Sequence, residues 1–92
     1  MAEPSAPFLY HPPIKRSVTI AGHQTSISLE PLYWDALNEA AVKLDIPLNA
    51  LVARIDVERM AAETPPGLAG AIRLWLFANH SRQPEGDDIY CK

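Results

Sequence analysis

Three short polar side chains, Gln24, Ser26 and Ser28, occupy alternate positions in the first third of the chain. Their amide and hydroxyl groups both donate and accept hydrogen bonds. The alternation is typical of a half-buried β-strand, with one polar and one apolar face. The apolar face consists of Thr25, Ile27 and Leu29. The sequence therefore predicts a strand over residues 24–29, whose polar face either binds a hydrogen-bonding partner or is simply solvated.

Basic side chains accompany this strand. Lys15, Arg16 and His23 fall within residues 14–29, a segment that contains no acidic residue, although the chain as a whole has a net charge of −3. The overall charge argues against nucleic acid as a partner, whereas the local excess of basic groups favours an anionic one.

No pattern in the sequence is typical of an active site or a metal centre. No nucleophile lies beside a base, and the adjacent carboxylates Asp87 and Asp88 fall in a polar C-terminal segment. The three histidines, at positions 11, 23 and 80, lack zinc-site spacing. Cys91 is the only cysteine, so the chain has neither a disulfide framework nor a set of thiolate ligands. We expect no enzyme, no cofactor and no metal.

The compartment follows from what the sequence does not contain. No basic start is followed by a long apolar run, and the longest apolar cluster, residues 74–78, is too short to span a bilayer. Together with the single cysteine, this predicts a protein of the reducing cytoplasm.

A second alternating stretch, residues 17–20, precedes the principal strand. Its apolar side chains would share the core face of that strand, and Gly22 can adopt the positive φ that a tight turn requires, so a short hairpin is expected. Pro31 ends the strand and opens a helix, because its fixed φ and missing N–H suit the first helical position.

Apolar residues at helical spacing predict a first helix over residues 31–44. Asp45 is a suitable left-handed C-cap, and Pro47 can begin a second helix after a very short link. That helix is expected to end near residue 62. Its apolar stripe consists of Leu48, Leu51, Val52 and Ile55.

A third helix is expected over residues 68–79, with Thr64 as its N-cap and Pro65 at its first position. Arg73 is its only charged residue before position 77, so we expect this helix to be buried on more than one side and to form a subunit interface. The side chains expected to reach another subunit are Leu74, Trp75 and Phe77.

One domain is predicted over residues 14–80, between a flexible arm at residues 1–13 and a disordered tail at residues 81–92. So small a domain is marginally stable alone, yet 48% of the 92 residues are hydrophobic. The principal strand also has at most one neighbour in its own chain. Both observations favour an obligate homodimer.

The order of strand, helix, tight turn and helix resembles the ribbon-helix-helix family, to which the Arc, methionine and CopG repressors belong. The resemblance rests on residues 25–29, on Trp34 and Leu37 in the first helix, and on residues 48–52 at the start of the second. Residues 15–23 further resemble a small bacterial subgroup of that family. The implied fold is mainly α with a short β-ribbon, an intertwined ribbon-helix-helix homodimer carrying an extra C-terminal helix.

The resemblance implies that two protomers pair their strands and insert the resulting ribbon into the DNA major groove. Gln24, Ser26 and Ser28 would then contact base edges, since a glutamine amide pairs with adenine and serine pairs with several bases. The start of the second helix would bind phosphate through free backbone N–H groups. The expected phosphate contacts are Lys15, Arg16, His23, Leu48 and Asn49.

A second hypothesis belongs to a different class. The acidic balance, the neutral polar face of the strand and the apolar third helix also fit a protein-interaction or oligomerisation module that keeps this fold without binding DNA. The two hypotheses differ in whether double-stranded DNA or only another protein is the partner.

Overall fold

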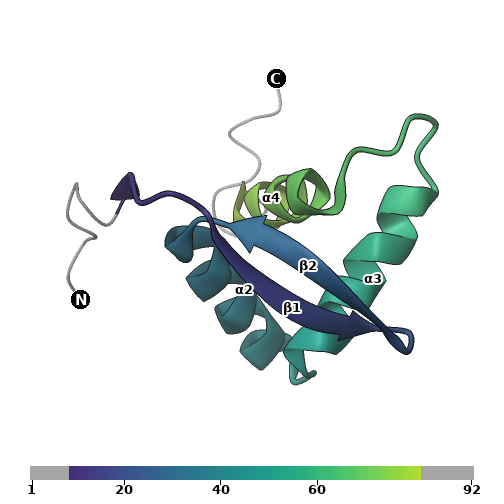
Figure 1. Cartoon of the computed structure of the whole chain (residues 1–92), viewed down its shortest axis with the longest axis horizontal. Helices are drawn as coiled ribbons and strands as arrows, with labels where there is room; N and C mark the ends of the chain where they lie inside the picture. The colour runs from purple at the N-terminus through teal and green to yellow at the C-terminus, as the bar shows by residue number, and fades with distance from the viewer. Residues whose placement is uncertain (1–8, 82–92) are drawn as a thin grey trace.

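A two-stranded antiparallel hairpin is followed by three helices in a computed structural model that describes residues 9–81 (Figure 1). The hairpin packs on all three helices, which lie on one side of it. This arrangement confirms the predicted fold of a short β-ribbon, two closely linked helices and an extra C-terminal helix. The elements are β1 (Ile14–Ile20), β2 (His23–Leu29), α2 (Pro31–Leu44), α3 (Leu48–Met60) and α4 (Leu68–Ser81).

The predicted hairpin is confirmed, and both of its strands begin earlier than the alternation indicated. Ile14 lies opposite Leu29, and the pairing continues to Ile20 opposite His23. A two-residue turn joins the strands, with φ of 50° at Ala21 and 84° at Gly22. Positive φ at both central positions is the geometry of a type I′ turn, whose twist matches that of the strands.

The predicted boundaries of α2 are confirmed at both ends. Pro31 occupies the first turn, and the carbonyl of Glu30 accepts hydrogen bonds from the N–H groups of Tyr33 (2.9 Å) and Trp34 (3.0 Å). Asp45 ends the helix in the left-handed conformation, with φ of 60° and ψ of 42°. α2 therefore starts two residues after β2, which fixes the direction in which the hairpin leaves the helical layer.

The predicted cap residues of the other two helices were wrong, although α4 begins at Leu68 as predicted. Pro47 is the N-cap of α3 rather than its first residue, because its ψ of 156° is extended and its carbonyl already accepts the first helical hydrogen bonds. Thr64 and Pro65 lie outside α4, because a residue that precedes a proline, as Pro65 does, is disfavoured in the helical region. Gly67 is the residue whose carbonyl accepts the first hydrogen bond of α4, from Ala71 N–H at 2.9 Å.

Twelve buried apolar side chains form one core, to which the hairpin and each helix contribute three. Among the residues described, no polar or charged side chain is fully buried. Within the single chain α4 is buried on one side only, since Leu74 and Phe77 are 65% and 71% exposed, and the expected burial of its other side against a second subunit stays a prediction. The core consists of Val18, Ile27, Leu29, Trp34, Leu37, Ala41, Leu51, Val52, Ile55, Ala71, Ile72 and Leu76.

Some predictions fall outside residues 9–81. Most of the predicted arm at residues 1–13 and of the predicted tail at residues 81–92 lies there, as do Asp87, Asp88 and Cys91. In the described part of the arm, Leu9 and Tyr10 are exposed. No helix within the described range has both the length and the apolar character needed to cross a membrane.

Candidate nucleic-acid interface

Six polar side chains cover the face of the hairpin that points away from the helices. The alternation that buries Val18, Ile27 and Leu29 turns the intervening residues of both strands outward. All six are exposed except Ser28, which is half-buried, and none is acidic. In cross-strand order they are Lys15 opposite Ser28, Ser17 opposite Ser26 and Thr19 opposite Gln24. The structure thus brings the three predicted base-contacting residues together and adds β1 side chains to them.

The outer edge of β2 carries unpaired backbone groups from these same positions. Ile20 and His23 flank a two-residue turn, so they form a hydrogen-bonded pair. Because hydrogen-bonded and non-hydrogen-bonded pairs alternate in an antiparallel ladder, the N–H and C=O groups of Gln24, Ser26 and Ser28 point outward from β2. The sheet of the described chain has two strands, so no third strand covers this edge.

The predicted basic cluster divides between the two faces of the hairpin. Lys15 shares the outward face with the polar residues, whereas Arg16 lies opposite the buried Ile27 and therefore belongs to the other face. The Arg16 guanidinium carbon sits 5.1 Å from the centre of the Trp34 ring, within the range of a cation–π interaction. His23 is exposed beside the turn, and its position in the alternation also places it on the inner face of the hairpin.

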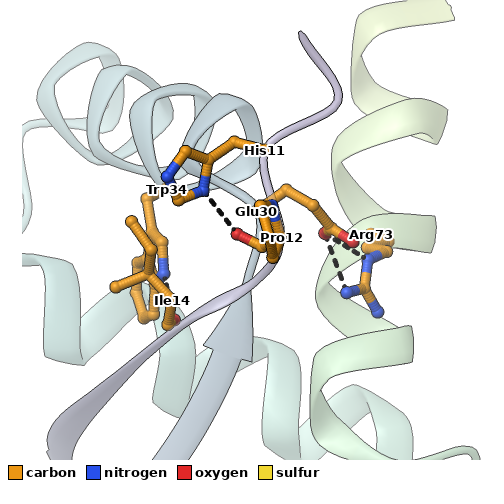
Figure 2. Close-up of polar contacts among 6 residues, drawn as sticks. All are labelled: His11, Pro12, Ile14, Glu30, Trp34 and Arg73. Carbon is orange, nitrogen blue, oxygen red and sulfur yellow. Dashed lines mark hydrogen bonds and ion pairs between the residues drawn. The ribbon is translucent and has the colours of Figure 1, made fainter. Parts of the chain in front are cut away.

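β1 is tied to the helical layer by Trp34, as Figure 2 shows. The indole Nε1–H of Trp34 donates a hydrogen bond of 2.9 Å to the Ile14 carbonyl, and the Trp34 side chain is 1% exposed. A buried indole needs such a partner for its N–H. The contact fixes the start of β1, so the polar face is formed within a single protomer.

An ion pair joins α4 to the junction between β2 and α2 (Figure 2). Arg73 donates hydrogen bonds from Nε (3.1 Å) and Nη2 (2.8 Å) to the same carboxylate oxygen of Glu30. These hydrogen bonds are the main reason why the pKa of the Glu30 carboxyl is lowered from its ordinary value. The Arg73 guanidinium also lies 5.5 Å from the centre of the Tyr33 ring. Sequence reasoning missed this pair, although a single charge within an apolar helix was a usable signal.

The start of α3 offers backbone donors, as predicted. The N–H groups of Ala50 and Leu51 both donate to the Pro47 carbonyl at 3.1 Å, so the donors left at this terminus are those of Leu48 and Asn49. The Asn49 side chain is exposed, whereas that of Leu48 packs against the core. In Figure 1 this terminus lies beside the end of α2, away from α4.

Elsewhere the described surface has an open groove between α2 and α4, but no group of three or more metal-ligating side chains within residues 9–81. Trp75, half-buried, lies in this groove with charged and polar neighbours from both helices. The lining residues are Ala36, Glu39, Ala40, Lys43, Leu44, Trp75, Leu76, Asn79 and His80. They offer no arrangement of nucleophile and base.

Comparison with known proteins gives one family. A family model described as a ribbon-helix-helix domain matches residues 13–80, which include both strands, α2, α3 and nearly all of α4. No curated protein and no solved structure gave a significant match to the chain.

Proposed function

The chain belongs to the ribbon-helix-helix domain family, whose members are typically DNA-binding regulators rather than enzymes, and on this premise we propose that it is a homodimeric, sequence-specific DNA-binding regulator of transcription. The observation that carries the proposal is the outward face of the hairpin, where Lys15 and five neutral hydrogen-bonding side chains stand without an acidic residue. Such a regulator acts on DNA in the bacterial cytoplasm.

The unpaired edge of β2 is where the proposed homodimer forms. A solvent-exposed strand edge is a template for another strand, and in this family the strand before the first helix pairs between protomers. The outward backbone groups of Gln24, Ser26 and Ser28 supply that pairing. An antiparallel register centred on Ser26 joins the two hairpins into one four-stranded sheet.

Base recognition is assigned to the centre of that sheet. Gln24 has an amide that pairs bidentately with adenine, and the hydroxyl groups of Ser26 and Ser28 donate or accept as the base requires. Phosphate contacts are assigned to Lys15 and to the backbone donors of Leu48 and Asn49. Arg16 and His23 are left out of this set, because both belong to the other face of the hairpin.

A second candidate function is supported by α4. Its exposed Leu74 and Phe77 lie one helical turn apart, and such a pair of large apolar side chains favours a protein partner. Trp75, predicted to join them, is instead half-buried in the groove against α2. In this alternative the domain assembles with protein and has no affinity for DNA at physiological salt.

The two functions are separated by titrating fluorescent duplex DNA from the region upstream of the protein's own gene, and a scrambled duplex, at low and physiological salt. We expect the wild type to prefer its own region at least about a hundredfold, as specific readers do. The variant in which Gln24, Ser26 and Ser28 are all alanine should keep the dimer but lose the preference.

Circular dichroism and light scattering serve as controls, because the three side chains lie on the outward face, outside the core, and their truncation should leave the fold intact. An unchanged preference in the triple variant would overturn the assignment of these residues. Absence of wild-type binding at physiological salt would favour the protein-interaction function.

A further inference from the structure

The first strand presents a row of polar side chains to the same side as the residues assigned to base recognition. We propose that β1 forms the phosphate-binding flank of the DNA surface, with Lys15, Ser17 and Thr19 contacting the sugar-phosphate backbone and not the bases. This inference rests on the proposed function. It divides the outward face into a central strand that determines sequence preference and an outer strand that determines affinity.

The width of the sheet leads to this division. Neighbouring strands lie about 4.8 Å apart, so the two β1 strands at the outside of the proposed four-stranded sheet are about 14 Å apart. The major groove is only about 12 Å wide and admits two strands. The central β2 strands therefore fit over the base edges, while each β1 strand comes against a phosphate wall of the groove.

The chemistry of β1 suits that position. Lys15 is an exposed cation, and the exposed hydroxyl groups of Ser17 and Thr19 can each donate a hydrogen bond to a phosphate oxygen. No acidic side chain occurs in either strand to repel phosphate. The nearest acid along the chain, Glu30, is held by Arg73 on α4.

The position of β1 is also fixed before DNA is bound. The register pairs Lys15 with Ser28 and Ser17 with Ser26, so each β1 side chain stands directly beside a side chain of the central strand. The hydrogen bond from Trp34 to the Ile14 carbonyl holds the start of the strand next to Lys15. A preformed flank contacts phosphate without first ordering a loop.

The charge is tested with Lys15→Gln, measured against the matched control Lys43→Gln on α2, which removes the same charge from another exposed site. Each phosphate contact contributes about 0.9 to the slope of log affinity against log salt, so losing two per dimer should lower the slope by about 1.8. Binding to the preferred and scrambled duplexes should weaken by the same factor. Lys43→Gln should leave the slope unchanged.

The hydroxyl positions are tested with the double variant Ser17→Asp and Thr19→Asp, which sets carboxylates against the phosphates, and with the alanine pair as its uncharged control. We expect the aspartates to weaken binding to both duplexes at least about tenfold and the alanines to weaken it slightly, with the preference ratio unchanged in both. Circular dichroism checks that the hairpin is retained.

Three outcomes would overturn the inference. A preference ratio that changes in the β1 variants would mean that β1 contacts bases, and a salt slope that is the same for Lys15→Gln and wild type would mean that β1 is not at the phosphates. Both leave the proposed function standing, because the wild type still binds DNA specifically. A wild type without DNA affinity overturns the proposed function and this inference with it.

Discussion

The hairpin and α4 contribute equally to the core but differ in what they leave exposed. Each buries three apolar side chains in the same cluster. The outward face of the hairpin carries amides, hydroxyls and an ammonium group, whereas α4 exposes Leu74 and Phe77. Water can hydrogen-bond to the polar face of the hairpin, whereas exposure of the apolar face of α4 to water is unfavourable.

The difference indicates that the two surfaces suit different partners. A polar, non-acidic strand face suits a hydrogen-bonding polyanion, and an apolar helix face suits a protein surface. Arg73, which extends from α4 to Glu30 at the end of β2, is the polar contact that joins the two regions.

The largest effect is expected from removing the apolar face of α4. Burial of a large apolar side chain contributes about 1.5–3 kcal/mol, so the double variant Leu74→Ser and Phe77→Ser should weaken any assembly held by this face by several kcal/mol. Light scattering over a range of concentrations should show loss of species larger than the dimer.

The matched control for α4 is Val57→Ser on α3, where an apolar side chain is 70% exposed, close to the values for Leu74 and Phe77. This substitution should leave the mass unchanged. An identical mass for the α4 double variant and the wild type would show that the apolar face of α4 is solvated. This face would then bind no protein partner, contrary to the proposed difference between α4 and the hairpin.

An intermediate effect is expected from damaging the turn of the hairpin. Gly22→Ala should lower the free energy of unfolding by about 1–2 kcal/mol, because Gly22 has φ of 84° and an L side chain is strained there. No heavy atom lies within 4 Å of the added Cβ, so the cost is conformational rather than steric. Denaturant unfolding measures it.

Gly67→Ala is the control for the turn variant, because its Cβ would also meet no atom within 4 Å while its φ lies outside the positive range. We expect Gly67→Ala to change the unfolding free energy by less than about 0.5 kcal/mol. Equal losses in the two variants would show that the turn conformation does not limit the stability of the hairpin.

The smallest effect is expected at the ion pair between the regions. Partly exposed pairs contribute about 0.2–1 kcal/mol, so Glu30→Gln should destabilise the protein by that amount at neutral pH. Because the folded-state pKa of Glu30 is lowered, its stabilising contribution is present above the ordinary pKa and is lost as the pH falls through the folded-state value.

The difference between Glu30→Gln and wild type in urea unfolding should therefore shrink as the pH is lowered from 7 into the acid range. A difference that stays constant with pH would mean that the Glu30 charge is not what stabilises this contact.

The elements of the fold were predictable wherever the pattern was local. Alternation located both strands, Pro31 and Asp45 set the boundaries of α2, and Gly22 indicated the turn. The role of Pro47 at the start of α3 was mistaken because a proline is compatible with both the N-cap and the first helical position. Only ψ, which depends on the following residues, distinguishes the two.

The alternation of residue types predicted which side chains share the outward face of the hairpin. It did not predict which residues far apart in the sequence contact one another. Gln24, Ser26 and Ser28 lie on the outward face as predicted. The predicted first strand began at residue 17, whereas β1 includes Lys15 and Arg16, so their placement on opposite faces was not predicted. The contact between Glu30 and Arg73 joins residues 43 positions apart, and no local pattern predicts such a distance along the chain. The exposed side of α4 could not be predicted from a helix that is apolar on nearly all sides.

The hydrogen bond from Trp34 to Ile14 bears on how such a domain diversifies during evolution. Inner-face and outward-face positions alternate along both strands, and a slip by one residue would exchange them. Because Trp34 holds the register from the start of β1, the outward positions can mutate among polar types without disturbing the core. Partner preference and stability are then free to evolve independently within the same sixteen-residue hairpin, from Ile14 to Leu29.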